Sequence, residues 1–191
     1  MEITIVTADG SLVTANSYQN QDLFWALRGG GGGTWGVVTS VTYKTHPSTP
    51  FSGALLLVNS TNVDSTQNLL GEMIRLTPSL VEQGYGGYAL GTPNQFTLAV
   101  ISPNVTANQT QDTFSPLFKF ATSQPGLSAI STTVVFKDYW EFYNVLLSYD
   151  VGSVGVPSEI SSWLLPKDVV QTDKPKDLAG ELLKLSYFGY L

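Results

Sequence analysis

The chain has 191 residues, 42% hydrophobic and 13% charged, a composition typical of a soluble globular protein with one or two domains. Nine basic residues against fifteen acidic ones give a net charge of −6, which disfavours nucleic-acid binding. Because cysteine is absent, disulfides and zinc–cysteine sites are excluded. The longest apolar run, Ala54 to Val58, is too short to span a membrane, and the many neutral polar residues favour a secreted protein.

The N-terminal part is predicted to contain a hairpin, a short helix and a further strand. Alternating polar and apolar residues predict strands from Glu2 to Thr7 and from Leu12 to Ala15, joined by a two-residue turn at Asp9-Gly10. A helix capped by Asn20 or Asp22 follows, and its buried face is expected to comprise Leu23, Phe24, Ala26 and Leu27. After a glycine run, the Val- and Thr-rich segment from Trp35 to Tyr43 predicts a strand.

Prolines at positions 47 and 50 indicate a boundary, so we expect one domain over residues 1–48 and a second over 49–191. Strands are predicted at Gly53–Asn59, Tyr85–Leu90, Phe96–Ile101 and Thr132–Phe136. Helices are predicted at Asp64–Leu76, Thr110–Thr122 and Tyr139–Leu147, the last capped by Asp138. This order favours the α+β class, with a mostly antiparallel sheet and helices on one face.

The five glycines from Gly29 to Gly33 are the most unusual local feature. Gly31, Gly33 and Gly36 have the spacing G-x-G-x-x-G, but a helix precedes the run and a strand follows it, which is the wrong order for a Rossmann dinucleotide site. A glycine run can be a flexible linker, or it can let a ligand approach the main chain closely. The flanking Trp25 and Trp35 favour the second interpretation.

Three blocks in this region together suggest a family: Asp9-Gly10-Ser11-Leu12-Val13-Thr14-Ala15-Asn16, Asp22-Leu23-Phe24-Trp25-Ala26-Leu27-Arg28 with the glycines, and Trp35-Gly36-Val37-Val38-Thr39. They resemble the end of the PCMH-type FAD-binding domain in berberine-bridge-enzyme-like oxidases, a branch of the vanillyl-alcohol-oxidase (VAO) superfamily, and the fungal members above all. The resemblance implies that main-chain groups contact the adenine end of FAD at Gly31, Gly32, Gly33, Gly36, Val37 and Val38.

Other side chains near the glycines are assigned more ordinary roles. Trp25 and Trp35 are expected to pack in the core rather than to stack on flavin. Arg28 either contacts phosphate or caps the preceding carbonyls, and capping is favoured. His46, the only histidine, is expected to be structural, and no metal site is predicted.

The second domain is similar to part of a substrate-binding domain of the same family. The segment from Ser161 to Pro166 resembles the family's Ser-Arg-Leu-(Leu or Ile)-Pro, although Trp163 stands where arginine is usual. Tyr85, Tyr88 and Phe96 are candidates for the substrate face of the sheet, and packing in the core is the competing interpretation.

The resemblance implies an FAD-dependent oxidoreductase that oxidises an alcohol, amine or sugar carbon by hydride transfer to flavin, with O₂ as the acceptor. In the family, the pyrophosphate loop and the flavin-linked histidine precede the first block, and a base follows in a later segment. We therefore expect the chain to be a fragment that binds FAD weakly or not at all by itself, and no catalytic residue is named.

Two other functions are compatible with the sequence. One is a secreted, non-catalytic binding or interaction module derived from the oxidase fold, and the other is a carbohydrate-binding secreted protein. Three N-x-Ser/Thr sequons, at Asn59, Asn104 and Asn108, are either glycosylated or unmodified surface positions. The partners expected from the family are a small-molecule substrate and O₂, with neither nucleic acid nor membrane.

Overall fold

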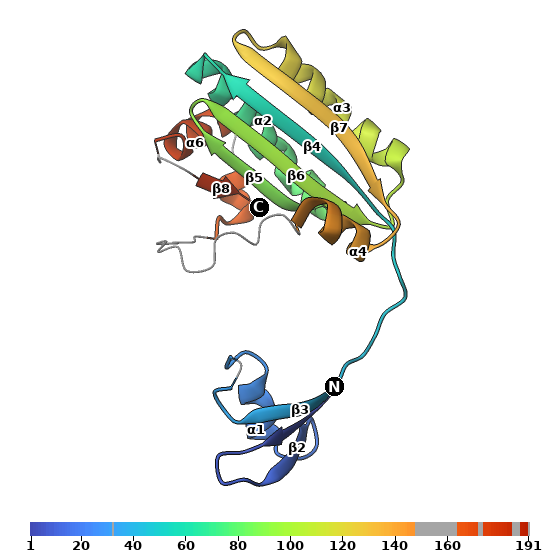
Figure 1. The fold of residues 1–191 in the computed structure, drawn as a ribbon. Coiled ribbons are helices and arrows are strands. Elements are labelled where there is room, and N and C mark those ends of the chain that lie inside the picture. The colour runs from blue at the N-terminus through green and yellow to red at the C-terminus, as the bar shows by residue number, and fades with distance from the viewer. Residues whose placement is uncertain (32, 148–163, 172–173, 185–187, 191) are drawn as a thin grey trace. The chain divides into compact units, whose positions relative to one another are not determined.

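The structure, a computed structural model, describes residues 1–31, 33–147, 164–171, 174–184 and 188–190 (Figure 1). The chain divides into two compact units, Met1–Pro47 and Ser48–Leu191, each with its own sheet. The division falls one residue before the boundary that the prolines indicate.

The first unit is a three-stranded antiparallel sheet with one helix. Strands β1 (Glu2–Val6), β2 (Leu12–Asn16) and β3 (Val37–Thr42) lie in the order β2-β1-β3. The predicted hairpin is confirmed, because β1 pairs with β2 from Glu2 opposite Asn16 to Val6 opposite Leu12.

The turn of this hairpin is longer than predicted. The Thr7 amide donates to the Ser11 carbonyl and the Gly10 amide donates to the Thr7 carbonyl, so the connection runs from residue 7 to residue 11. Gly10 has φ +84°, which glycine adopts without strain. The Asp9 carboxylate accepts from the Thr7 and Ser11 side chains and from the Ser11 amide, and these bonds lower its pKa. The prediction of a two-residue turn at Asp9-Gly10 was therefore wrong.

Helix α1 (Gln21–Leu27) covers this small sheet. Phe24 is buried beside Ile3 and Ala15, and Leu23 and Leu27 pack against them. Asn20 occupies the cap position, but its side chain donates to the Thr14 carbonyl at 2.8 Å and makes no cap bond. The predicted capping role of Asn20 was wrong because this bond holds its amide against β2.

The second unit is built on a five-stranded, wholly antiparallel sheet. Its strands are β4 (Phe51–Ser60), β5 (Gly86–Thr92), β6 (Gln95–Pro103), β7 (Leu127–Phe136) and β8 (Phe188–Tyr190). They lie in the order β7-β4-β6-β5-β8, and every adjacent pair is antiparallel. The predicted α+β class with antiparallel sheets is confirmed, whereas strand β8 was not predicted.

Two long helices, α2 (Val63–Glu82) and α3 (Ala107–Ser123), cover one face of this sheet (Figure 1). The short helices α5 (Lys167–Val170) and α6 (Pro175–Leu182) pack against α2. Between helices and sheet lies a core that includes Leu56, Leu69, Leu70, Ile74, Phe96, Leu98, Phe114 and Leu117. Helix α2 continues past the predicted end at Leu76 and through Pro78, because Leu80 belongs to this core.

Side chains cap the longer helices as the sequence requires. The Asn62 side chain accepts from two amides at the start of α2. Thr106 and Gln109 form a reciprocal capping box at the start of α3. Asp138 accepts from the Glu141 amide at 2.8 Å and starts α4 (Tyr139–Phe142), which continues as the π-helical segment η1 (Tyr143–Leu147). Among the described residues, no helix has the length and apolarity needed to cross a membrane.

Candidate functional site

The glycine run begins where α1 ends. The Arg28 amide donates to the Trp25 carbonyl and the Gly30 amide to the Ala26 carbonyl, so the last helical turn extends into the first glycines. Gly29 has φ +140° and Gly31 has φ +88°, conformations that disfavour residues with a Cβ. The run is therefore an ordered turn between α1 and β3 on either side of Gly32, which lies outside the described residues.

Two of the glycines are required by contacts within the unit itself. A Cβ on Gly30 would lie 2.3 Å from Nε1 of Trp35 and 2.5 Å from the Ala26 carbonyl oxygen. A Cβ on Gly36 would lie 2.2 Å from the carbonyl oxygen of Val6. All three distances are too short for a Cβ atom. The absence of a side chain at Gly30 therefore lets the Trp35 indole approach the main chain, and its absence at Gly36 lets β1 do so.

The other described glycines of the run have open space beside them. No atom lies within 4 Å of the Cβ position of Gly29 or Gly33, and the nearest atom at Gly31 is the Thr34 hydroxyl at 3.4 Å. All three have positive φ. Their positive φ favours glycine at all three positions, and the open space beside them leaves room for a ligand at the main chain.

Strand β3 continues from this loop as an exposed edge. Val37 is 69% exposed and Val38 is 44% exposed. The register with β1 shifts between Thr4 and Ile5, which leaves Thr39 as an extra residue of β3, and its hydroxyl donates to the Thr4 carbonyl at 3.2 Å. A bulge of this kind redirects a strand locally. The structure thus presents two apolar side chains directly after the open glycines.

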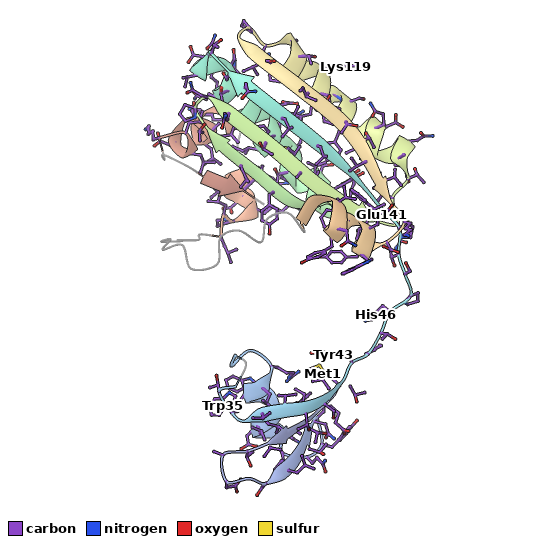
Figure 2. All side chains as sticks on the ribbon, viewed as in Figure 1. Met1, Trp35, Tyr43, His46, Lys119 and Glu141 are labelled. Carbon is purple, nitrogen blue, oxygen red and sulfur yellow. The ribbon has the colours of Figure 1, made fainter. Side chains whose placement is uncertain are left out.

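The aromatic and basic neighbours differ from what was predicted. Trp25 is 76% exposed and Trp35 is 47% exposed, so the predicted packing of both in the core was wrong. Figure 2 shows Trp35 beside the loop, where its indole lies against Gly30. The guanidinium of Arg28 lies 4.3 Å from the centroid of the Phe24 ring, while its amide, rather than its side chain, makes the bond at the helix end.

This surface fits a cofactor that is bound through the main chain. From residue 29 to residue 42 the sequence has no charged side chain, so amides and carbonyls are the polar groups on offer. Bare main chain at Gly31 and Gly33, followed by exposed Val37 and Val38, suits a flat heteroaromatic group such as adenine. Of the predicted contacts, Gly31 and Gly33 have accessible main chain, and Val37 and Val38 are exposed on opposite faces of β3. Gly36 is packed against β1, and Gly32 lies outside the described residues.

The second unit offers a sheet face that the long helices do not cover. Alternate residues of its strands point away from α2 and α3, among them Leu57, Ile130, Thr132 and Tyr88, which are exposed. In the part of the chain that the structure describes, α4 reaches this side: Tyr139 contacts Phe51, and Phe142 contacts Phe136, at one end of the sheet. Strands β4 to β7 contain no charged residue, so the open face is neutral and largely apolar.

The structure separates the three predicted substrate residues. Tyr85 is buried under the helices, where its hydroxyl is 2.9 Å from Thr110 Oγ1 and its ring packs edge-on against Phe114. Phe96 is also in the core. Tyr88 alone reaches the open face. A substrate role for Tyr85 and Phe96 was wrong, because the alternation of the strands directs both toward the helices.

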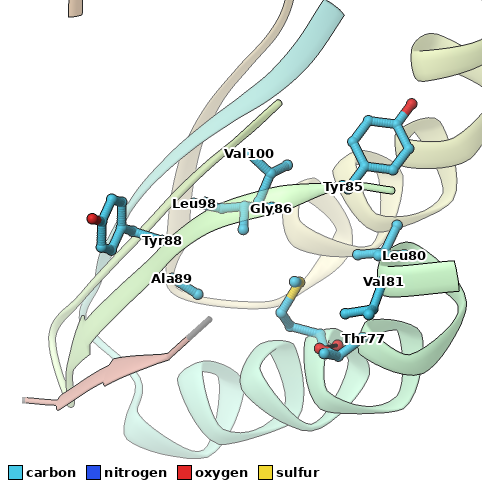
Figure 3. Close-up of a pocket in the computed structure, with 11 residues that line it drawn as sticks. Thr77, Leu80, Val81, Tyr85, Gly86, Tyr88, Ala89, Leu98 and Val100 are labelled. Atoms are coloured by element: carbon cyan, nitrogen blue, oxygen red, sulfur yellow. Dashed lines mark hydrogen bonds between the residues drawn. The ribbon is translucent and has the colours of Figure 1, made fainter. Parts of the chain in front are cut away.

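A small cavity lies between α2 and β5 (Figure 3). It is lined mainly by apolar side chains, and its volume of about 30 Å³ suits one water molecule. Substrate cavities are typically about ten times larger or more. The cavity is therefore a packing gap beside Gly86 and Gly87, the part of β5 that β8 does not pair with.

The remaining predicted positions are the histidine, the sequon asparagines and the family-like segment near residue 163. His46 is exposed in the segment between β3 and β4 (Figure 2). Asn59, Asn104 and Asn108 are all exposed, and Asn104 has φ +59°. Ser161 to Trp163 of the family-like segment lie outside the described residues. The described part of the chain contains no cluster of metal-binding side chains.

Comparison with known proteins identifies relatives along most of the chain. An uncharacterized FAD-linked oxidoreductase of Arthroderma benhamiae is 37% identical over 148 residues, which is 74% of this chain and 26% of the relative. FAD-linked oxidoreductase apf9 of Gibberella fujikuroi is 30% identical over 192 residues, which is 91% of this chain and 33% of the relative. No family model matches the chain.

Solved structures show the same fold. The VAO-type flavoprotein MtVAO615 of Myceliophthora thermophila C1 aligns with a TM-score of 0.70 and 23% identity over 97% of this chain and 34% of that one. The VAO-type flavoprotein MtVAO713 of the same organism aligns with a TM-score of 0.60 and 27% identity over 75% of this chain and 28% of that one. The chain is thus related to FAD-linked oxidoreductases and has the fold of VAO-type flavoproteins.

The resemblance seen in the three N-terminal blocks is thereby confirmed. The chain spans about a quarter to a third of the length of the curated relatives it matches. Sequence reasoning located the glycine loop but missed the division among its glycines, because that division depends on Val6 and Trp35. It expected an open sheet face, because it placed the helices on one face, but of the three residues named for that face only Tyr88 lies on it.

Proposed function

We propose that this chain supplies part of the FAD-binding domain and part of the substrate domain of an FAD-dependent oxidoreductase. The reaction is oxidation of an alcohol, amine or sugar carbon of a small molecule, with hydride transfer to flavin and O₂ as the acceptor. The observation that supports this most strongly is the glycine segment between α1 and β3, where Gly31 and Gly33 have positive φ and open space at their Cβ positions.

The residues divide into those that bind and those that shape the site. Main-chain groups of Gly31, Gly33, Val37 and Val38 would hold the adenine end of FAD, with the more exposed Val37 side chain against its ring. When bound, FAD supplies the hydride acceptor. Trp35 and Gly36 keep the loop against α1 and β1, and so position the main chain that contacts the cofactor.

The open face of the second sheet would form the substrate side. Tyr88 provides a hydroxyl on that face, and Leu57 provides apolar contact area. The assignment of residues 1–48 to the FAD-binding domain and of 49–191 to the substrate domain follows from this division of roles.

FAD affinity of the chain alone should be low. The described residues of the first unit would contact FAD on one side only, through accessible main chain, whereas a bound cofactor is normally enclosed over most of its surface. Segments that the relatives have outside the matched region would supply the other walls and the base. We also propose that the protein is secreted, with glycans on the exposed sequon asparagines, on the basis of composition.

A matched pair of glycine substitutions tests the cofactor site. We would place this chain in the relative from Arthroderma benhamiae in exchange for the matching segment, purify the chimera and measure flavin absorbance per protein. Gly33→Ala is the test, and Gly10→Ala in the hairpin is its control. Gly33 has φ +76° and Gly10 φ +84°, and neither has an atom within 4 Å of its Cβ position, so the two substitutions impose the same strain.

The proposal is supported if the chimera contains flavin and Gly33→Ala lowers its affinity for FAD about tenfold or more, while Gly10→Ala leaves that affinity unchanged. A tenfold loss corresponds to about 1.4 kcal/mol of binding free energy. Equal flavin content in both variants would refute contact between the loop and the cofactor. A folded chimera without flavin would favour the non-catalytic module. Strong flavin absorbance in the isolated chain would contradict the low affinity proposed for it.

A further inference from the structure

Strand β7 forms one edge of the second sheet. It pairs with β4 over its full length, from Phe136 opposite Phe51 to Leu127 opposite Ser60, without a break in register. Within the described part of the chain, no strand pairs with its other side. Ten residues of regular strand therefore present a row of backbone donors and acceptors.

This edge lacks the features by which proteins usually protect an edge strand. Charged residues, proline and bulges are the common protections. The sequence Leu-Ser-Ala-Ile-Ser-Thr-Thr-Val-Val-Phe contains no charge, proline or glycine, and its pairing with β4 shows no bulge. Ile130 is 71% exposed and Val135 is 59% exposed. Helix α3 packs over one face of the strand, where Thr133 bonds Gln111, and leaves the edge open.

The sequence of β7 is complementary to itself. If two copies pair antiparallel about a two-fold axis at Thr132, then Ile130 lies opposite Val134, Ala129 opposite Val135 and Ser131 opposite Thr133. From residue 129 to residue 135, apolar residues then meet apolar ones and hydroxyls meet hydroxyls, pairs that stabilise adjacent strands. Ser128 opposite Phe136 departs from this pattern. Shifting the axis by one residue in either direction places Ile130 opposite Thr132, or Thr132 opposite Val134, and loses this match.

We propose that two copies of this chain associate through β7, with Thr132 on the two-fold axis, to form a continuous ten-stranded sheet. Closed two-fold symmetry is the commonest form of self-association. The strand has no charge, so the pairing brings no like charges together despite the net charge of −6. Both α3 helices then lie on the same face of the joint sheet. This association does not depend on the proposed flavin chemistry.

Cysteine cross-linking tests the register directly, because the natural chain has no cysteine. Opposite residues of an antiparallel pair have Cα atoms about 4.5–5.5 Å apart, within the range of about 4.4–6.8 Å that a disulfide spans. Thr132→Cys should form a disulfide-linked dimer under mild oxidation. Ile130→Cys should not link to itself, because four residues, or about 14 Å, separate the two copies. A mixture of Ile130→Cys and Val134→Cys should give the mixed dimer.

A second experiment measures association without chemistry. Sedimentation velocity of the full-length chain should show a concentration-dependent dimer. Thr132→Lys, which places two ammonium groups opposite each other, should weaken it about tenfold or more. Thr97→Lys is the control, since Thr97 lies on the same open face but in β6, inside the sheet. Circular dichroism of each variant verifies folding.

The outcomes separate edge pairing from other contacts. A chain that stays monomeric at every concentration and gives no Thr132→Cys cross-link would overturn the proposal. Equal loss of dimer in Thr132→Lys and Thr97→Lys, with no cross-link at position 132, would indicate stacking of the open faces and would also overturn it. If Thr132→Lys does not fold, the cross-linking pattern of the cysteine variants decides.

Discussion

The buried hydroxyl pair of Tyr85 and Thr110 gives a quantitative test of the core. The two oxygen atoms are 2.9 Å apart, Tyr85 is 6% exposed and Thr110 is fully buried. Removing one hydroxyl leaves the other without this partner, which costs about 1–3 kcal/mol, whereas removing both is nearly neutral. Tyr85→Phe and Thr110→Val should therefore each destabilise the second unit, and the double variant should cost less than their sum by about 1–2 kcal/mol.

The assay is urea unfolding of the four proteins of this cycle, followed by far-ultraviolet circular dichroism. Tyr88→Phe is a matched control, because it removes a phenolic hydroxyl from an exposed side chain and should change the free energy of unfolding by less than about 0.5 kcal/mol. Additive single effects, within about 0.5 kcal/mol, would refute coupling between the two hydroxyls. A role for Tyr85 in the core rather than in substrate binding would then lose its energetic support.

Three further predictions concern other parts of the chain. Gly36→Ala should destabilise the first unit by about 1–3 kcal/mol, because the new Cβ meets the Val6 carbonyl; limited proteolysis should then cut residues 1–47 first. Asn62→Ala should lower the free energy of unfolding by about 1 kcal/mol in urea, through loss of the α2 cap. The bond from Lys167 lowers the pKa of Glu82 below its ordinary 4.5, so the ion pair stabilises α5 above that pH and the stabilisation is lost in more acidic solution. Amide hydrogen exchange in α5 should therefore speed up relative to its intrinsic rate as the pH falls below 4.5, and Glu82→Gln should abolish this effect.

The sequence predicted the sheet of the second unit well because its strands alternate. Phe96, Leu98 and Val100 face the helices, and Thr97 and Ala99 between them face away, which is the period that the structure shows. Pro93 and Asn94, residues common in turns, connect β5 to β6, and Thr92 pairs with Gln95 on either side of them. Local pattern and tertiary structure agree in these strands, so sequence reasoning succeeds.

Where long-range contacts decide, the sequence was insufficient. Leu80 keeps α2 helical beyond Pro78, and that requires the core to be known. Trp25 was expected in the core because tryptophan usually is, yet α1 buries only Phe24 fully and leaves the indole outside. The distinction between Gly36, which packs on β1, and Gly33, which packs on nothing, depends on an element thirty residues earlier in the chain.

The neutrality of the open sheet face limits what it can contribute to a reaction. Strands β4 to β7 contain no aspartate, glutamate, histidine, lysine or arginine. A molecule resting on these strands would find apolar side chains, amides and hydroxyls, but no carboxylate or imidazole to take up a proton. Different segments of the polypeptide would then select the molecule by its shape and remove its proton. Substitutions in one segment could change the first property without changing the second.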